Sequence, residues 1–387
     1  MKTKRTVLCL NGGSSSLKFA VFEVGAGEER RVVTGAVEGV GTAQGRASLK
    51  AGEEHVERAG HFADAGAALD VAFELLDSKG VPKPDVVGHR VVHGGPAHTD
   101  PAVVDDALLA ALRSVVPIAP LHMPGAIAAM EAVRKRSPRL VQVACFDTAF
   151  HRTMPSVASR LPLPEALDRD GVRRYGFHGL SYEYIVSALG KDRPSRIVIA
   201  HLGNGSSLVA VKDGVSVDTT MGFTPTGGVP MGTRSGDLDP GVMLYLARER
   251  GYSMERLEKL VEHESGLLAV GGASDVKTLI ARAPTDDRAR LALDLFGYAV
   301  RKAIGSFAAV LGGVELLVFT GGIGEHAAEV RARACDDLGF LGLALDVEKN
   351  RRNEAVISDA TSRCIVRVLP TDEELVIARH ASALLGT

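Results

Sequence analysis

The sequence has no tryptophan and only four cysteines in 387 residues, and aromatic residues make up just 5% of it. The cysteines lie far apart and form no Cys-x-x-Cys pair, which favours neither a zinc knot nor a disulfide framework. We therefore expect four reduced thiols in the core of a cytoplasmic protein. They are Cys9, Cys145, Cys335 and Cys364.

Long hydrophobic runs and a charge excess of one sign are also missing. No window approaches the roughly 20 apolar residues needed to cross a bilayer. The apolar stretch near the start, Val7 to Leu10, is shorter than the ~7 to 15 residues of a signal-peptide core. The formal net charge is -2 with both signs interspersed, so nothing resembles a basic stripe or a polybasic tail. We expect no secretion, no nucleic-acid partner and no membrane partner.

The composition, 45% hydrophobic and 24% charged, is that of a globular protein large enough for two domains. Short apolar, β-branched runs alternate with helical stretches, which predicts an α/β protein. The proline-rich segment TMPSVASRLPLPEA follows residue 152 and indicates a domain boundary near residue 150.

One strand pattern occurs twice. The run TVLCL leads through NGGSSSLK into FAVFEV, and RIVIAHL later leads through GNGSS into LVAVKDG and VSVDTT. Each reads as a hairpin whose turn is rich in small residues. This repetition is typical of a duplicated, two-lobed protein, although two unrelated hairpins would give the same pattern.

Three glycine-rich segments could meet a nucleotide. NGGSSSLK offers backbone N–H groups, hydroxyls and a lysine to phosphate oxygens. It is not a Walker A loop, because a strand rather than a helix follows the lysine, and ordinary turn chemistry remains the alternative. HLGNG is the second segment, and GGIGEH, between a strand and a helical pattern, could admit a flat ring or a sugar close to the backbone.

Four charged residues, Arg90, Asp147, His178 and Arg234, stand at the polar edges of apolar or glycine-rich stretches. Cationic groups in such places could neutralise the oxygens of a phosphoryl group during transfer. Taken singly, each residue has a simpler interpretation as part of an ordinary surface or core ion pair.

Two further pairs of residues have simpler interpretations. His89 and His93 have the spacing of helical zinc ligands, but VVGHRVVHGG reads as a strand and lacks the glutamate of a His-Glu-x-x-His site, so we expect no metal there. Asp237 and Asp239 are expected to shape a polar turn after Arg234, with an inward contact to that arginine as the alternative.

The motifs together resemble the acetate and propionate kinase family. The resemblance runs over nearly the whole chain, through NGGSSSLK, HRVVHGG, APLH, FDTAFH, RRYGFHG, HLGNGSS, MGFTP, MGTRSGDLDP, ESGLL, FTGGIGE and PTDEE. It implies a duplicated ribonuclease H-like fold of two lobes, as in the sugar kinase, actin and heat-shock chaperone ATPase superfamily, with the nucleotide in the cleft between the lobes. The N-terminal lobe would span 1–149, with a terminal helix over 373–387 packing back on it. The C-terminal lobe, over 150–372, would bind nucleotide and form a homodimer.

The resemblance also implies roles for individual residues. Asp147, His178 and Arg234 take the catalytic positions, and Asn11 and Glu373 the magnesium-linked ones. The carboxylate-binding arginine is Arg90, and the apolar acid pocket falls on Val92, Leu121, Phe177 and Pro225. The ATP contacts fall on Lys18, His201, Leu202, Gly203, Asn204, Gly205, Asp275, Val276, Lys277, Gly321, Gly322, Ile323, Gly324 and Glu325.

The sequence departs from the family pattern at several places. Met123 stands where Asn is usual, Leu180 and Tyr182 replace Thr and His, and PTGGVP replaces an acidic PLEG segment around 226–230. These departures bear on substrate preference and lobe closure rather than on the reaction.

The implied reaction is reversible in-line transfer of the γ-phosphoryl group of ATP to acetate, with Mg²⁺ or Mn²⁺, giving acetyl phosphate and ADP. The acceptor is ionised at neutral pH, so it needs no strong base, and we expect Asp147 to orient magnesium-bound water or the acceptor. Propionate or butyrate is the alternative acceptor. A non-kinase ATPase scaffold of the same fold is the alternative from another class.

Overall fold

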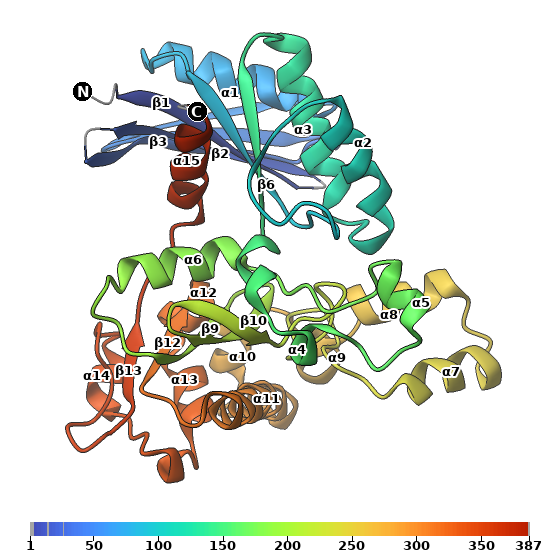
Figure 1. Ribbon diagram of the computed structural model, residues 1–387, viewed down its shortest axis with the longest axis vertical. Helices are drawn as coiled ribbons and strands as arrows, with labels where there is room; N and C mark the ends of the chain where they lie inside the picture. Colours follow the sequence, from blue (N-terminus) through green and yellow to red (C-terminus); the bar gives the residue numbers. More distant parts are fainter. Residues whose placement is uncertain (1–3, 14, 26, 386–387) are drawn as a thin grey trace. The chain divides into compact units, whose positions relative to one another are not determined.

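The computed structural model describes residues 4–13, 15–25 and 27–385. The chain forms two compact units, one made of Met1–Ala149 with Asp372–Thr387 and the other of Phe150–Thr371. Each unit is built on one mixed β-sheet with helices on both faces (Figure 1).

The first unit holds an eight-stranded sheet in the order β5-β4-β3-β2-β1-β6-β8-β7. β1 pairs antiparallel with β2 and parallel with β6, and β6 pairs parallel with β8. The strands are β1 (Arg5–Gly12), β2 (Ser16–Gly25), β3 (Glu28–Glu38), β4 (Gly45–Ala51), β5 (Glu54–Gly60), β6 (Val86–Val91), β7 (Ala102–Val103) and β8 (Val141–Phe146).

Alternate side chains of β1 face opposite layers of helices. Leu8 and Leu10 belong to a core cluster with residues of α1 (Ala65–Ser78) and α3 (Met123–Arg136). Cys9 faces the other way, where its Sγ donates to the Glu374 carbonyl oxygen of α15 (Glu373–Leu384) at 3.3 Å. Gly88 of β6 lets α15 approach closely, because a Cβ there would lie 2.4 Å from Cγ2 of Ile377.

The second unit holds a five-stranded sheet in the order β11-β10-β9-β12-β13. One face packs on the long helix α11 (Asp287–Leu311), and the other on α6 (Gly179–Ala188). The strands are β9 (Arg196–Leu202), β10 (Ser206–Lys212), β11 (Val215–Thr219), β12 (Leu316–Thr320) and β13 (Ile365–Val368).

The two sheets repeat one topology. In the second unit, β9 pairs antiparallel with β10 and parallel with β12, just as β1 pairs with β2 and β6. β13 continues the parallel part as β8 does in the first unit. The order of strands 3-2-1-4-5 thus occurs twice, which confirms the predicted duplicated ribonuclease H-like fold.

The remaining elements connect and flank the sheets. They are η1 (Val116–Ile118), η2 (Ala149–Thr153), η3 (Gly339–Leu341), α2 (Asp106–Val115), α4 (Ser156–Ser159), α5 (Glu165–Arg169), α7 (Pro240–Glu249), α8 (Met254–His263), α9 (Gly266–Gly271), α10 (Val276–Arg282), α12 (Gly321–His326), α13 (Ala328–Cys335) and α14 (Val347–Arg351). No helix in the described ranges combines the length and the apolar character needed to cross a membrane.

Most of the predicted elements are confirmed, with one difference. Both hairpins form, the C-terminal segment is helical, and all four cysteines are buried and lie outside any disulfide. The segment GGIGEH, however, is not a turn that precedes a helix, because the whole segment forms the helix α12. Gly321 alone makes the turn, with φ of 76°, and α12 begins at that residue.

Candidate active site

Parallel strands of the first unit bring four of the predicted site residues together. Asn11 lies near the end of β1, Arg90 near the end of β6, and Asp147 directly after β8. Since these strands run parallel, their carboxyl ends meet at one edge of the sheet. Glu373 is the first residue of α15, which packs on the same strands.

Arg90 joins two carboxylates at this edge. Its Nε and one Nη donate to the two oxygens of Asp147 at 3.2 and 2.7 Å, a bidentate pair. Its Nε also lies 3.4 Å from an oxygen of Glu373. The Asp147 side chain is 1% exposed, whereas that of Arg90 is 21% exposed and so remains open to an anion.

Burial and the neighbouring charges shift the pKa values of Asp147 and Arg90. Burial raises the pKa of Asp147 to about 6; the charge of Glu373 adds to this rise and Arg90 opposes it. Burial alone would lower the pKa of Arg90, but the charges of Asp147 and Glu373 outweigh it, and the net change is upward. Arg90 is therefore a permanent cation whose partner Asp147 can be protonated under mildly acidic conditions.

The first hairpin places Lys18 beside this edge. Asn11 of β1 and Lys18 of β2 are direct cross-strand partners, and the Lys18 side chain is exposed. The turn packs tightly on the start of α3, because a Cβ on Gly125 would lie 2.4 Å from the Gly13 carbonyl oxygen. Ser14, within the predicted phosphate loop, lies outside the described residues.

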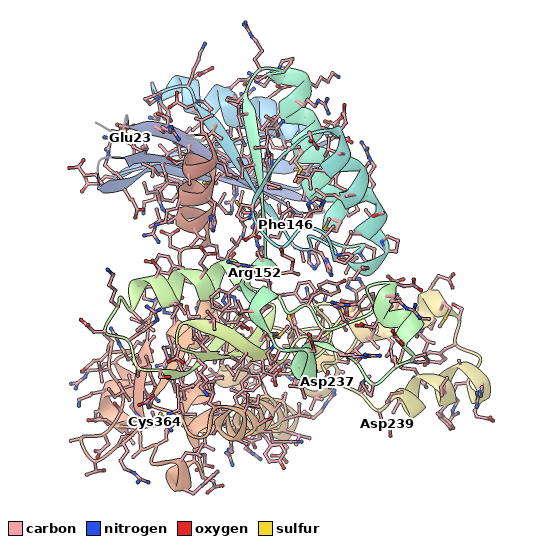
Figure 2. The ribbon with its side chains drawn as sticks, in the orientation of Figure 1. Glu23, Phe146, Arg152, Asp237, Asp239 and Cys364 are labelled. Carbon is pink, nitrogen blue, oxygen red and sulfur yellow. The ribbon has the colours of Figure 1, made fainter. Side chains whose placement is uncertain are left out.

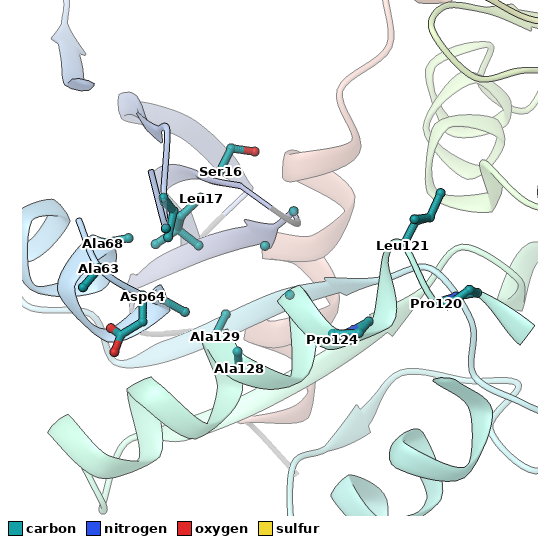
Figure 3. Close-up of a pocket in the computed structure, with 16 residues that line it drawn as sticks. Ser16, Leu17, Ala63, Asp64, Ala68, Pro120, Leu121, Pro124, Ala128 and Ala129 are labelled. Atoms are coloured by element: carbon teal, nitrogen blue, oxygen red, sulfur yellow. The ribbon is translucent and has the colours of Figure 1, made fainter. Parts of the chain in front are cut away.

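A cavity of about 370 Å³ lies under this hairpin, in the first unit (Figure 3). Its walls come from the hairpin turn, the start of α1 and the segment that leads into α3, and they are mainly apolar. Leu121, which the sequence assigns to the acid pocket, is one of the lining residues.

In the second unit, two histidine rings stack at the edge where β9 ends. The ring centroids of His178 and His201 are 4.3 Å apart, with an interplanar angle of 20°. The Nδ1 of His178 is 2.8 Å from Ser207 Oγ, and the Nδ1 of His201 is 2.8 Å from Ser181 Oγ. His178 has φ of 59°, a left-handed conformation that ends the preceding loop and starts α6.

Arg234 approaches the same histidine. A Cβ placed on Gly205 would lie 3.0 Å from Nε2 of His178 and 3.5 Å from an Nη of Arg234, so both groups converge on the 203–205 turn. Arg234 itself is held by the Pro225 carbonyl oxygen at 3.2 Å and by Glu262 at 3.5 Å.

The predicted nucleotide segments follow the neighbouring strands β9 and β12, which are parallel. A Cβ on Gly321 would lie 2.7 Å from the Leu202 carbonyl oxygen, so 321–325 starts directly beside 201–205. A Cβ on Gly322 would meet no atom within 4 Å, which leaves open space above the backbone. Asp275 caps α10 by accepting from Thr278 N at 2.8 Å.

The residues expected to form the acid pocket are divided between the two units. Val92 and Leu121 belong to the first unit and are half-buried, whereas Phe177 and Pro225 belong to the second and are buried. Val92 packs on the core cluster that contains Phe146, labelled in Figure 2.

Comparison with known proteins identifies the family. The model of the acetokinase family matches residues 6–379. An acetate kinase of Nitrobacter hamburgensis is 44% identical over 98% of this chain and 96% of its own. A propionate kinase of Citrobacter rodentium is 42% identical over 96% and 95%. The crystal structure of Porphyromonas gingivalis acetate kinase superposes with a TM-score of 0.89 and 36% identity, covering 98% of this chain and all of the other.

The chain belongs to the acetokinase family. This confirms the resemblance seen in the sequence, and it extends from the first strand into the last helix.

A divalent cation would suit the edge of the first unit. The described residues contain no cluster of three or more His, Cys, Asp or Glu side chains that could hold a metal by themselves. Magnesium usually keeps several waters and takes only one or two carboxylates besides substrate phosphates. Glu373 and Asn11 would supply a carboxylate and an amide oxygen, the kinds of ligand such an ion takes, and the two carboxylates of Glu373 and Asp147 around the single charge of Arg90 leave negative charge for it to balance.

The two histidines and two aspartates for which the sequence predicts structural roles have clear hydrogen-bond partners. His89 Nε2 bonds to Gln142 at 2.8 Å inside the sheet, and His93 Nδ1 accepts from Gly95 N at 2.8 Å. Asp237 accepts from Gly228 N at 2.7 Å, and Asp239 caps α7 by accepting from Gly241 N, also at 2.7 Å (Figure 2). The two aspartates shape the turn as predicted.

The departures from the family pattern have structural consequences within their own units. Met123 is fully buried in the cluster that contains Phe146. Leu180 and Tyr182 are buried on α6, and the Tyr182 hydroxyl hydrogen bonds to Ser207. Thr226, in the replaced acidic segment, donates its hydroxyl to Glu262.

Three residues that support the site are not evident from the sequence pattern. Glu262 of α8 holds Arg234, yet nothing in an amphipathic, largely exposed helix indicated this role. Ser207 stands inside the motif HLGNGSS, which could have indicated its role.

Arg331 is fully buried, and its five N–H donors are all bound, to Asn350, Asn353 and the carbonyl oxygens of Gly324 and Glu325. It thereby fixes the end of α12, where 321–325 lies.

Glu262→Gln tests the support of Arg234. The amide keeps the shape of the side chain but removes the charge that holds the guanidinium, so we expect kcat to fall about tenfold, equivalent to about 1.4 kcal/mol in the barrier, with a smaller change in the KM for ATP. Steady-state kinetics measure this. The control is Glu264→Gln, which breaks only a pair with Arg256 and Lys259. Equal rates in Glu262→Gln and wild type would contradict the role.

Proposed function

We propose that this chain is an acetate kinase that transfers the γ-phosphoryl group of ATP reversibly to acetate. The observation that carries the proposal is the buried Asp147 carboxylate holding Arg90 in a bidentate pair at the edge of the first sheet. A guanidinium fixed in this way presents a directed cation to an incoming carboxylate. The family shown by the sequence match has the same activity in its name.

Asp147 acts by position rather than as a base. Acetate is already ionised at neutral pH, since its pKa is near the value of about 4.3 for Glu, so no proton needs to be removed before attack. Both Asp147 oxygens already accept hydrogen bonds from Arg90, which supports a role in orienting the acceptor-binding guanidinium. Arg90 then binds the acceptor and screens its repulsion from the phosphates.

His178 and Arg234 stabilise the transition state in this proposal. Both approach the 203–205 turn, and both can donate to oxygens on which charge accumulates during transfer. Lys18 and the segments 201–205, 275–277 and 321–325 bind the nucleotide. Glu373 and Asn11 hold the divalent ion, which would neutralise phosphate charge when bound.

The second unit also supports a homodimer. α7 has no buried residue, and it exposes Val242, Leu244 and Tyr245. These exposed apolar side chains offer a surface that a second copy of the chain could cover, and that copy is the proposed partner. Light scattering should give twice the chain mass. The four buried cysteines, none of them in a disulfide, support a cytoplasmic location.

Acetyl phosphate formation tests the function directly. Wild-type enzyme, acetate, MgATP and hydroxylamine should yield acetyl hydroxamate, with acetate preferred over propionate and butyrate in kcat/KM. ATP hydrolysis without hydroxamate would instead indicate a non-kinase ATPase of the same fold. A higher kcat/KM for propionate would make the chain a propionate kinase, the activity named for the Citrobacter rodentium relative.

Val92→Ala tests the choice of acid. The additional methylene of propionate improves the binding free energy by about 0.8 kcal/mol if the pocket has room for it. If the pocket is already filled, forcing the methylene in weakens binding by about 1 to 3 kcal/mol. Removing two methyl groups at Val92 should therefore shift the ratio of kcat/KM values about fourfold or more toward propionate, chiefly through a lower KM. An unchanged ratio would mean that other residues, such as Met123, set the depth of the pocket.

The pH dependence of the reaction should report Asp147. Its pKa is raised to about 6, so it is ionised and holds Arg90 above that pH and becomes protonated below it. We expect kcat/KM for acetate to fall as the pH drops through about 6, well above the titration of acetate itself. A profile measured at saturating MgATP that stayed flat down to pH 5 would contradict this assignment.

A further inference from the structure

We propose that Tyr182 is a positioning residue that acts through Ser207 to hold His178 as the tautomer with its proton on Nε2. The proposal rests on the proposed function, in which His178 stabilises the transferred phosphoryl group. It assigns a role to a residue that stands where the family usually has histidine.

Tyr182, Ser207 and His178 form a chain of hydrogen bonds, the relay, and all three side chains are buried or half-buried. The Tyr182 hydroxyl hydrogen bonds to Ser207 Oγ, and the same oxygen lies 2.8 Å from Nδ1 of His178. Tyr182 and Ser207 are both 0% exposed, so water has no access to the shared oxygen. The rings of Phe150 and His151 pack against Tyr182 with centroids 6.1 and 5.6 Å away, which fixes the phenol.

The direction of the protons follows from the chemistry of the three groups. A serine hydroxyl has one proton to donate and can accept hydrogen bonds at its two lone pairs. A phenol is a stronger acid than an alkyl hydroxyl, so Tyr182 is the better donor to Ser207. Ser207 then directs its own proton to Nδ1 of His178, and a neutral ring must carry its proton on Nε2.

That proton points toward the candidate nucleotide turn. Nε2 of His178 is the nearest atom to a Cβ built on Gly205, at 3.0 Å. The relay therefore supplies an N–H donor toward 203–205 without requiring the imidazole to be charged. A ring protonated only on Nδ1 would instead present a lone pair to the phosphate oxygens and repel them.

Ser181, the residue before Tyr182 on α6, forms a similar hydrogen bond with the ring of His201. Ser181 Oγ lies 2.8 Å from Nδ1 of His201, which stacks on His178. Ser207 and His201 are also cross-strand partners in the β9–β10 hairpin. Two consecutive α6 residues, Ser181 and Tyr182, thus control Nδ1 of the two stacked rings, one directly and one through Ser207.

Tyr182→Phe tests the relay, because it removes only the hydroxyl. We expect kcat to fall about 10- to 100-fold, while the KM values for ATP and acetate change less than threefold. Long-range ¹H–¹⁵N spectra of the histidine-labelled enzyme should show His178 moving from the Nε2–H tautomer toward a mixture of tautomers. His178→Gln identifies its signals among the 12 histidines. The matched control is Tyr184→Phe, on the same helix but only partly buried.

The kinetic and spectroscopic results together distinguish a role of Tyr182 in setting the His178 tautomer from a role in packing alone. Loss of kcat together with a tautomer change, absent in Tyr184→Phe, supports the relay. A kcat within twofold of wild type overturns it. A fall in kcat with His178 still protonated on Nε2 also overturns it, since Tyr182 would then serve packing alone. If the wild-type enzyme forms no acyl phosphate, the proposed function fails, but the spectra still decide whether Tyr182 sets the tautomer.

Discussion

A topological constraint underlies both halves of this protein. When the first strand of an antiparallel hairpin is also the first strand of a parallel row, the hairpin turn and the carboxyl ends of the parallel strands must lie at the same sheet edge. β1 imposes this on the first unit and β9 on the second. Polar residues that follow these strands are therefore gathered without any further device, and the turns bring backbone N–H groups to the same edge.

Each unit uses its edge for a different kind of charge arrangement. In the first unit, two carboxylates surround one guanidinium, and Asp147 is almost completely removed from water. Breaking such a pair by removing one partner costs about 3 to 5 kcal/mol, whereas an exposed pair is worth at most about 1 kcal/mol. The Arg234–Glu262 contact, at 3.5 Å with both side chains 17% exposed, is looser, as the role proposed for Arg234 in binding the transferred phosphoryl group would require. Arg331, unlike Arg90 and Arg234, has only neutral oxygens as its hydrogen-bond partners, and it holds the backbone around it in place.

The sequence predicted those parts of the site that depend on local pattern. The two hairpins follow from alternating apolar residues interrupted by small ones, and Arg90 and Asp147 were recognisable because each ends an apolar strand. The ion pair between these two residues joins strands that are adjacent in space, and the sequence held no sign of it. Glu262 and Tyr182 were out of reach for the same reason, since their partners Arg234 and Ser207 lie on other elements. The turn at Gly321 was predicted, but the immediate start of α12 was not, because glycines weaken a helix unless packing supports it.

In the proposed site, Asp147 contributes to catalysis by holding Arg90 for the acceptor, and a double-mutant cycle tests this role. The measured quantity is kcat/KM for acetate in Arg90→Gln, Asp147→Asn and the double variant, with thermal unfolding to check that each is folded. If Asp147 acts through Arg90, the double variant should be about as slow as Arg90→Gln alone. If the two losses multiply, Asp147 acts independently of Arg90, which would contradict its proposed role in holding the guanidinium.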